Sequence, residues 1–439
     1  MRSVISLCVL CMYYAVGEEV YTVAVLDPNS EIYEYGEISR TAKNGGADIL
    51  VIPTQHTEPE TRTNSYDKTL KELSTAAKEE RIYIVANLYN SITCQNRREL
   101  SRHNVVFNRN GAIVTISKKS THNCNDTQAN MVSFATDFGV KFGVMAEEDM
   151  VLHDVRGSDI RNYVVLGPWS ATTLFLSGEH FTPVWAFATK SNVISQYGVY
   201  GSSSITRSGN NAVAVLNKNG NDDDHITTYP VALSSLPGED LSNYVIKPLD
   251  LVRGSEGYQE SVCHESFCCG FDVKTTVNGN INKALSFGLT AYDGLLDVEG
   301  HRVGTQICAV IACAGLYKRS CLIQAGNTSV IFDKLTISAN FSVNTEHYPS
   351  ILTSTESTKH ILFQKNFGNN IDVKTIIHNA DNLLRIGIFG RDYRKDFIEL
   401  QNIDTEYISN ENVEEFFDYL WIRLRVLIFV VSIYILEMM

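Results

Sequence analysis

Residues 48–53 read DILVIP, a short apolar run that starts at an aspartate and stops at a proline. A stretch with helical spacing, Tyr35–Gly45, precedes the run and ends at a pair of glycines, which commonly stop a helix. Another helical stretch, Lys68–Glu79, follows it. A buried strand between two helices is typical of an α/β layered domain, so the residues on both sides are expected to continue the pattern.

The alternation of apolar runs and helical stretches extends from residue 20 to about residue 201. The tripeptide Arg109-Asn110-Gly111 is a turn signal, and the runs on either side of it predict a hairpin. The sequence therefore predicts an α/β fold for its first half. Strands are expected at Val20–Leu26, Asp48–Pro53, Ile82–Asn87, Asn104–Asn108, Ala112–Ser117, Lys141–Ala146 and Tyr163–Gly167.

The second half changes character after residue 219, where NGNDDDHITTYP forms a polar, turn-rich linker. Its aspartates lack the ligand spacing of calcium loops, so a solvated loop is the expected structure. Beyond the linker the expected strands are short and alternating, and helical patterns fade. A β-rich second domain is therefore predicted from about residue 230 to residue 405.

Length and charge limit the function. The chain has 439 residues, enough for two or three domains with a large core. Its formal net charge of −13 argues against a nucleic-acid partner, which would require clusters of lysine and arginine. No motif indicates a cofactor or a metal ion, so neither is expected.

Both ends of the chain resemble targeting segments. The apolar run Val4–Tyr14 and the small residues Ala15-Val16-Gly17 indicate a secretory signal peptide over residues 1–17, with a buried first strand as the alternative. Val426–Leu436, in the tail 406–439, is apolar but shorter than the roughly 20 residues of a membrane-spanning helix. This run fits a removable lipid-anchor signal, a short membrane helix or a helix docked on the protein. Secretion is the expected localisation, and the first two of these alternatives would add attachment to the membrane.

Cysteine usage supports the secreted interpretation. Eight cysteines remain after the signal, an even number that predicts four disulfides, with Cys94 and Cys124 as one pair. A zinc cluster is the alternative for Cys263-His264 with Cys268-Cys269, but adjacent cysteines and a secreted context disfavour it. Three Asn-x-Ser/Thr triplets are candidate glycosylation sites. The cysteines are Cys94, Cys124, Cys263, Cys268, Cys269, Cys308, Cys313 and Cys321, and the triplets start at Asn125, Asn327 and Asn340.

Several stretches occur in an order that one known family shares. They are IYIVAN (82–87), VVFNRNGAIV (105–114), FGV (142–144) with HD (153–154), VCHESFCC (262–269), AYDGLLDVEGHRVGTQIC (291–308) and IGIFGRDYRKD (386–396). Together they resemble the biotinidase/vanin group of secreted amidases, in the nitrilase or carbon–nitrogen hydrolase superfamily. The resemblance implies a nitrilase-like four-layer α-β-β-α sandwich over residues 18–220. It also implies a disulfide-stapled, β-rich vanin-type domain over residues 221–405.

The resemblance further implies an amide-hydrolysing site with three catalytic residues. Family members hydrolyse amides such as pantetheine or biotinyl-lysine with a glutamate base, a lysine that stabilises the oxyanion and a cysteine that forms a thioester. Thr54, after the proline of DILVIP, occupies the base position, and Lys119 matches the lysine. Counting forward from FGV and back from HD places Glu147 at the nucleophile position.

Two of the three catalytic positions therefore hold residues that are unsuited to the chemistry. A catalytically inactive vanin-like protein is predicted, with a binding or structural role toward an unidentified ligand or cell-surface partner. Residual amidase activity is the alternative. Lys119 and Glu147 are expected to form an ion pair across the former pocket, because an unpaired buried lysine is costly.

Three other features are predicted to be structural. The His153-Asp154 pair recurs in the resembled family away from the attacking thiol, so it is not expected to be catalytic. Trp169 and Trp185 are expected to fill the core. Arg391 is expected to anchor the C-terminal domain through carboxylate or carbonyl contacts.

Overall fold

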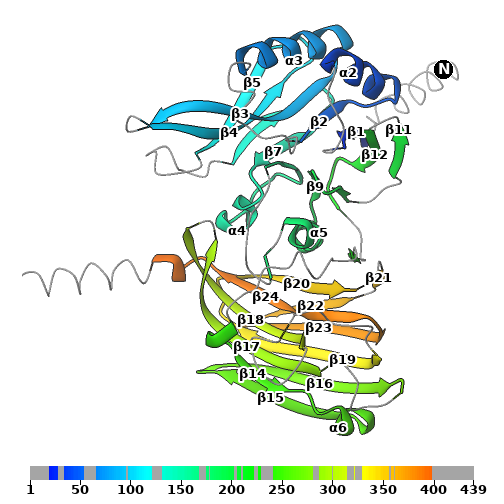
Figure 1. The fold of residues 1–439 in the computed structure, drawn as a ribbon, viewed down its shortest axis with the longest axis vertical. Helices are drawn as coiled ribbons and strands as arrows, with labels where there is room; N and C mark the ends of the chain where they lie inside the picture. The colour runs from blue at the N-terminus through cyan, green and yellow to red at the C-terminus, as the bar shows by residue number, and fades with distance from the viewer. Residues whose placement is uncertain are drawn as a thin grey trace, which may run out of the picture.

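The computed structural model describes most of the chain between residues 19 and 397. Four larger sheets and one two-stranded sheet make up the described chain. Figure 1 shows them as two stacked units, with the earlier residues above and the later ones below. The described residues are 19–27, 34–53, 66–94, 97–120, 131–167, 175–176, 178–201, 205–208, 211–221, 226–228, 241–279, 286–298, 300–313, 321, 329–354, 357–359 and 361–397.

Sheet A has seven strands, of which the central β1, β2 and β3 run parallel. Parallel neighbours need a crossover, and α2 (Tyr35–Asn44) and α3 (Tyr66–Glu80) supply it on the outer face of the sheet (Figure 1). Ala42 of α2 and Ala76 and Ala77 of α3 are fully buried, and their small side chains allow the helices to pack closely. Across the sheet, the strands are β11 (Ile205–Ser208), β12 (Asn211–Asn217), β1 (Val20–Leu26), β2 (Ile49–Ile52), β3 (Tyr83–Cys94), β4 (Arg97–Phe107) and β5 (Ile113–Ser120).

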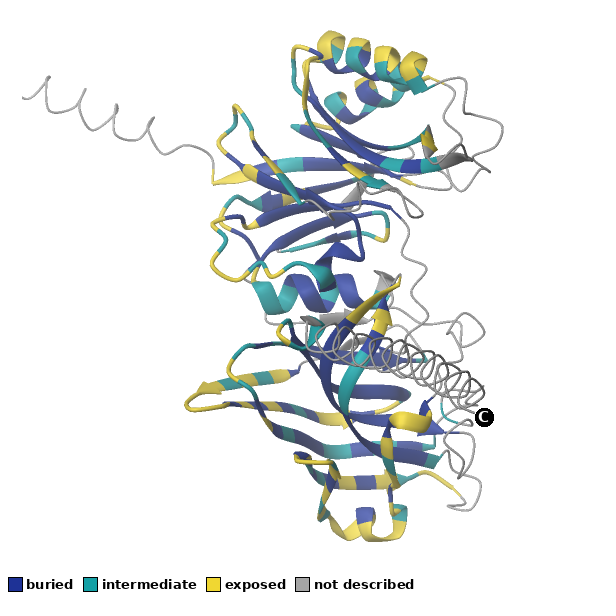
Figure 2. Cartoon of the chain, turned by 90° about the vertical axis from the view of Figure 1, so that its left-hand side faces the viewer, coloured by how far each residue is buried: buried dark blue, intermediate teal, exposed yellow. Residues whose placement is uncertain are grey.

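Sheet B packs face to face on the inner side of sheet A. Val51 and Val85 of sheet A meet Val144 and Val164 of sheet B in one apolar cluster. On the far side of sheet B lie α4 (Asp149–Leu152) and α5 (Gly178–Thr189), so the layers run α-β-β-α as predicted. Figure 2 shows the buried residues concentrated between these layers. The strands are β10 (Val199–Tyr200), β9 (Asn192–Ser195), β8 (Asn162–Val165), β7 (Lys141–Met145) and β6 (Val132–Ala135).

The second unit is a β-sandwich of sheets C and D, which confirms the predicted β-rich second half. Phe287 of sheet C meets Phe332 of sheet D edge to face, with ring centroids 5.0 Å apart. Its described helical turns are short: η3 (Leu241–Asn243), α6 (Leu251–Glu256) and η6 (Lys395–Phe397). Sheet C contains β14 (Val245–Pro248), β17 (Ser286–Val298), β18 (His301–Cys313), β24 (Leu383–Asp392) and β20 (Thr345–Thr353). Sheet D contains β15 (Tyr258–His264), β16 (Phe267–Val277), β19 (Val330–Phe341), β23 (Ile371–Ala380) and β22 (Leu362–Phe367).

Three predicted disulfides are present in the second unit. Cys269 of β16 bonds to Cys308 of β18 and joins the two sheets through their buried interior. Cys263–Cys268 closes the β15–β16 hairpin, and Cys313–Cys321 closes a short loop. The zinc alternative is therefore wrong, because Cys263, Cys268 and Cys269 all belong to disulfides.

The two units meet at α5 and at a small additional sheet. Phe181 of α5 packs against Tyr348 and Phe389 of sheet C, with ring centroids 5.1 and 5.9 Å apart. The two-stranded sheet pairs β13 (Ile226–Thr228) with β21 (Ser357–Lys359). Part of the expected linker is thus a strand.

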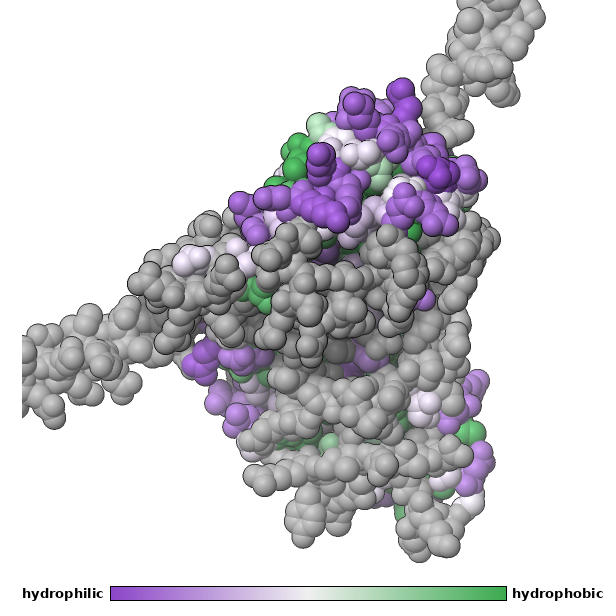
Figure 3. Space-filling view, turned by 45° about the horizontal axis from the view of Figure 1, so that its top comes forward, coloured by the Kyte–Doolittle hydropathy of each residue, from purple (hydrophilic) through white to green (hydrophobic). Residues whose placement is uncertain are grey.

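The outer face of α2 and α3 is hydrophilic over most of its area (Figure 3). Lys68 and Glu72 form an i,i+4 pair there at 3.7 Å, with 78% and 47% of their side chains exposed. Such a solvated pair stabilises a protein by at most a few tenths of a kcal/mol.

Two elements differ from the sequence prediction. The hairpin of β3 and β4 is longer than its apolar runs, because pairing continues to Cys94 and Arg97. The helix α5 was not predicted, and it contains Pro183, a residue that usually ends a helix. None of the described helices is long and apolar enough to span a membrane.

The signal peptide, the tail, Thr54, Cys124, Asn125, Trp169 and Asn327 lie outside the described residues, as does the side chain of Cys94.

Candidate functional site

The turn after β7 buries three consecutive carboxylates. Glu147, Glu148 and Asp149 have 0%, 0% and 1% of their surface exposed. Hydrogen bonds from Asp149 N to Ala146 O (3.1 Å) and from Met150 N to Glu147 O (3.2 Å) close the turn and start α4. Because a buried carboxylate is costly unless it is paired, each of the three needs a partner.

Two cations from the β4–β5 hairpin meet this turn. Arg102 and Lys119 are register partners on the two strands, so their side chains leave sheet A side by side. Arg102 Nη2 lies 2.5 Å and Lys119 Nζ lies 2.8 Å from the same oxygen, Oε1 of Glu148. Only 13% and 15% of the two cationic side chains are exposed, so this cluster is largely shielded from water.

The two cations set the charge of Glu148. Burial alone would raise the pKa of its carboxyl, but the charges of Arg102 and Lys119 outweigh burial and hold that pKa below its ordinary value. Glu148 is therefore ionised at neutral pH. Its other oxygen, Oε2, is buried and has no hydrogen-bond partner among the described residues.

Asp149 shares Lys119 with Glu148 and also closes the turn. Its Oδ1 lies 3.2 Å from Lys119 Nζ, and its Oδ2 accepts a hydrogen bond from the backbone N–H of Ala146 at 3.1 Å. The predicted Lys119–Glu147 ion pair is wrong, because the turn directs successive side chains to different partners. Glu147 contacts Tyr197 instead, whose hydroxyl donates to Oε2 at 3.3 Å.

Polar contacts beside the cluster fix the turn between the two sheets. Asn104 of β4 donates to the carbonyls of Met145 and Leu166, at the ends of β7 and β8, each at 3.4 Å. Gly167 follows with a φ of +109°, and a Cβ atom there would lie 3.1 Å from Arg102 Nη1. Glycine at this position therefore leaves room for the guanidinium.

Arg102 was not among the predicted site residues, although its position could be partly predicted. If the β4–β5 hairpin paired evenly on both sides of Asn110, Arg102 would lie opposite Lys118. A β-bulge at Val106–Phe107 shifts the register by one residue, so that Arg102 faces Lys119. The bulge thus decides which of two neighbouring lysines enters the cluster.

Two of the remaining predictions are confirmed. Trp185 is fully buried in the core. Arg391 is also fully buried and donates to the carbonyl of Val151 at 2.9 Å and to the carboxylate of Asp396 at 2.7 Å. The Asp154 carboxylate accepts a hydrogen bond from Arg156 Nε at 2.8 Å, a contact that fits a structural role for the His-Asp pair.

The cluster is a network of ion pairs. No group of three or more His, Cys, Asp or Glu side chains among the described residues is arranged to hold a metal ion. The described turn offers carboxylates, which are held by cations and a phenol, and it contains no thiol. Thr54 follows Pro53, the last described residue after β2, and lies outside the described residues.

Known proteins resemble both halves of the chain. Residues 234–396 match the vanin C-terminal domain. The chain is 26% identical over 301 residues to Vanin-like protein 3 of Drosophila melanogaster, a match that spans 57% of this chain and 57% of that protein. It is 25% identical over 371 residues to pantetheinase of Bos taurus, across 74% of this chain and 71% of that protein. The chain thus spans little more than half the length of the first relative.

Solved structures give a weaker likeness. An amidase from Nesterenkonia sp. and a carbon–nitrogen hydrolase from Helicobacter pylori G27 are 11% and 12% identical, with TM-scores of 0.31 and 0.32. Each covers 46% of this chain, and the matches span 92% and 90% of those proteins. The matched domain and the curated relatives point to the same group: the chain is similar to vanin-like proteins and pantetheinases, and residues 234–396 in its second half match a vanin C-terminal domain.

Proposed function

We propose that this chain is a catalytically inactive vanin-like protein and acts by binding or as a structural component. The observation that supports the proposal is the pairing of Lys119 with Glu148 and Asp149. A lysine that stabilises an oxyanion must be free to meet the growing negative charge. Lys119 already contacts two carboxylates, and their charges would also repel an anionic intermediate.

The residue types at the other two positions support the same proposal. A thioester needs a thiolate, and Glu147 has none; attack by its carboxylate would give an anhydride. Thr54, at the expected base position, does not accept a proton at neutral pH. Loss of a catalytic nucleophile alone lowers a rate by on the order of a million-fold.

Secretion is part of the proposal. Three disulfides are typical of an oxidising compartment, and the expected signal peptide over residues 1–17 would direct the chain there. Asn340 is exposed on β19, so its sequon is accessible to glycosylation. An unidentified ligand or cell-surface protein is the proposed partner, with the tail as the proposed membrane attachment.

Amide hydrolysis by the purified protein tests the catalytic part of the proposal. The substrates are pantetheine and a biotinyl amide, and an active pantetheinase serves as the positive control. We expect no turnover above buffer from the unmodified protein, and none from Glu147→Cys, because the base position would still hold Thr54. Turnover by the unmodified protein that Lys119→Ala abolishes would overturn the proposal and establish residual amidase activity.

A further inference from the structure

The helix α4 depends on side chains from elsewhere in the chain. It has a single turn, Asp149–Leu152, and isolated helices of this length do not form in water. The carbonyl groups at its end have no partner within the helix, as at any helix terminus. Three donors meet the carbonyls of this segment: Trp185 Nε1 binds Met150 O at 3.1 Å, Arg391 Nε binds Val151 O at 2.9 Å and Tyr393 Oη binds His153 O at 2.9 Å.

Two of these three donors come from the end of β24, 240 residues further along the chain. Arg391 has no exposed surface, and its guanidinium also donates to the carbonyl of Gly304 at 3.2 Å and to Asp396. Asp396 accepts a further hydrogen bond from the backbone N–H of Gly304 at 2.8 Å. The ring of Tyr393 lies 4.2 Å from the guanidinium carbon. These contacts hold the guanidinium in place independently of its hydrogen bond to α4.

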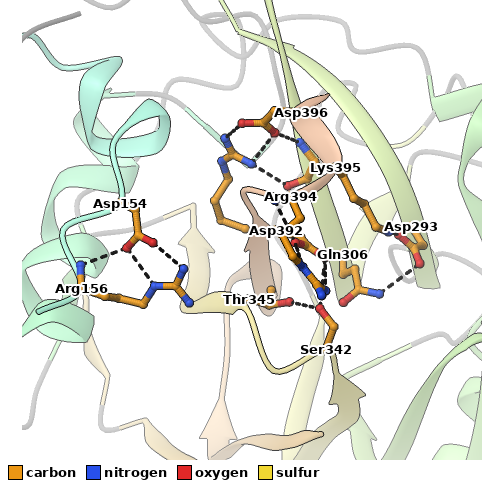
Figure 4. Close-up of polar contacts among 12 residues, drawn as sticks. Asp154, Arg156, Asp293, Gln306, Ser342, Thr345, Asp392, Arg394, Lys395 and Asp396 are labelled. Carbon is orange, nitrogen blue, oxygen red and sulfur yellow. Dashed lines mark hydrogen bonds and ion pairs between the residues drawn. The ribbon is translucent and has the colours of Figure 1, made fainter. Parts of the chain in front are cut away.

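Figure 4 shows the surroundings of this contact. Asp396 and Lys395 lie on the turn after β24, and Asp154 and Arg156 lie across from them on the segment that follows α4. Lys395 is itself paired with Asp293 of β17. The end of β24 is thus tied to its own sheet as well as to α4.

We propose that Arg391 is a positioning residue for the turn Glu147–Asp149. Sheet A holds the carboxylates of Glu148 and Asp149, through Arg102 and Lys119, and sheet C holds the helix that continues the turn, through the hydrogen bond from Arg391 to Val151 O. The geometry of the turn therefore depends on the β-sandwich, and this dependence exists whether or not the protein hydrolyses an amide.

A thiol at position 147 reports on the turn directly. Glu147 is fully buried, so the thiol of Glu147→Cys reacts with iodoacetamide only when the turn opens. Adding Arg391→Met should raise the alkylation rate roughly tenfold or more, because a hydrogen bond to a charged group contributes at least that factor to an opening equilibrium. The parent protein, alkylated in parallel, gives the background of the native cysteines.

Matched variants separate local opening from general loss of stability. Arg394→Met is the control, because Arg394 pairs with Asp392 at the same end of β24 and should leave the rate unchanged. Val23→Cys places a reporter in the buried layer between sheets A and B, and Arg391→Met should not change its rate. An equal rise at both reporters, or equal rates with Arg391→Met and Arg394→Met, would overturn the proposal.

Two milder variants keep the test open if Arg391→Met does not fold. Tyr393→Phe removes one hydroxyl and keeps the ring, so the thiol at position 147 should react roughly several-fold faster. Arg391→Lys keeps the charge but lacks the planar fork, so its rate should lie between those of arginine and methionine. Unchanged rates in both variants would reject the proposal. These rates do not depend on amide turnover, so they and the hydrolysis assay can fail independently.

Discussion

Arg102 and Lys119 stand directly opposite each other on β4 and β5, and both contact Oε1 of Glu148. Like charges in opposite positions on a sheet repel each other. The carboxylate between the two head groups removes this repulsion, and it is itself stabilised by them. Each of the three side chains therefore depends on the other two.

The first prediction concerns the loss of this carboxylate. Glu148→Gln should lower the free energy of unfolding by about 3 kcal/mol, because it removes the charged carboxylate that two largely buried cations contact. Urea unfolding at neutral pH measures the difference. Glu72→Gln is the control, since Glu72 belongs to a solvated pair and should change stability by less than about 0.5 kcal/mol. Equal losses in the two variants would contradict the prediction.

The second prediction concerns removal of both partners together. Arg102→Leu with Glu148→Leu should be less destabilising than Glu148→Gln alone, because apolar replacement of a buried pair leaves no uncompensated charge. Lys119 and Asp149 keep each other as partners in this variant. A double-mutant cycle in urea gives the coupling, expected to be about 1–3 kcal/mol. Additive effects would show that the two side chains act separately.

The third prediction follows from the ionisation of Glu148. Its pKa is lower in the folded protein than its ordinary value of 4.5, so the folded state holds fewer protons at this group. The stability that Glu148 contributes is complete above pH 4.5 and is lost as the pH falls through the lower folded value. The stability difference between the unmodified protein and Glu148→Gln should therefore be constant above pH 4.5 and shrink below it. A difference that shrinks as the pH rises would have the wrong sign.

The fourth prediction concerns His347, which is buried between sheets C and D. Burial, with smaller contributions from Lys365 and Arg156, lowers its pKa from 6.5 to about 3. The unfolded chain therefore takes up this proton first, and stability falls as the pH drops from 6.5 toward 3. His347→Phe keeps an aromatic ring against Phe341, 4.6 Å away in the unmodified protein, and should reduce this loss. Urea unfolding measured across that pH range gives the loss of stability. His301→Gln is the control: His301 is exposed, so this variant should lose as much stability as the unmodified protein does.

The fifth prediction ranks the disulfides. Cys269–Cys308 closes a loop with a sequence separation of 39, against 5 for Cys263–Cys268 and 8 for Cys313–Cys321. A longer loop gives a larger loss of entropy in the unfolded chain, so paired alanine substitutions at the first bond should cost about 3–4 kcal/mol and those at the other two less. Thermal unfolding of the three paired variants tests the order. A larger loss at either short loop would contradict it.

The sequence predicted the layers well because buried strands carry their own signal. The run at residues 20–26 became β1 with the same bounds, since every position of a strand between helices and a second sheet tends to be apolar. The partner of Lys119 could not be predicted in the same way. Three carboxylates follow one another after β7, and the choice among them depends on a bulge at Val106–Phe107 and on the backbone of one turn. Neither the bulge nor the backbone of the turn can be predicted from residue types alone.

α5 shows a second limit. Pro183 disfavours a helix at this position, but aromatic packing of Phe181 against sheet C stabilises α5. Tertiary contact of this kind outweighs local propensity.

The bridge between Arg102, Lys119 and Glu148 also restricts how this sequence can change over generations. Replacing Glu148 first removes the carboxylate that both cations contact, and replacing Arg102 first leaves Glu148 with one of its two cations, so each single step passes through a less stable protein. The two positions are therefore expected to drift together or not at all. A lineage that has acquired the bridge is held to it by epistasis, whatever selection now acts on the rest of the turn.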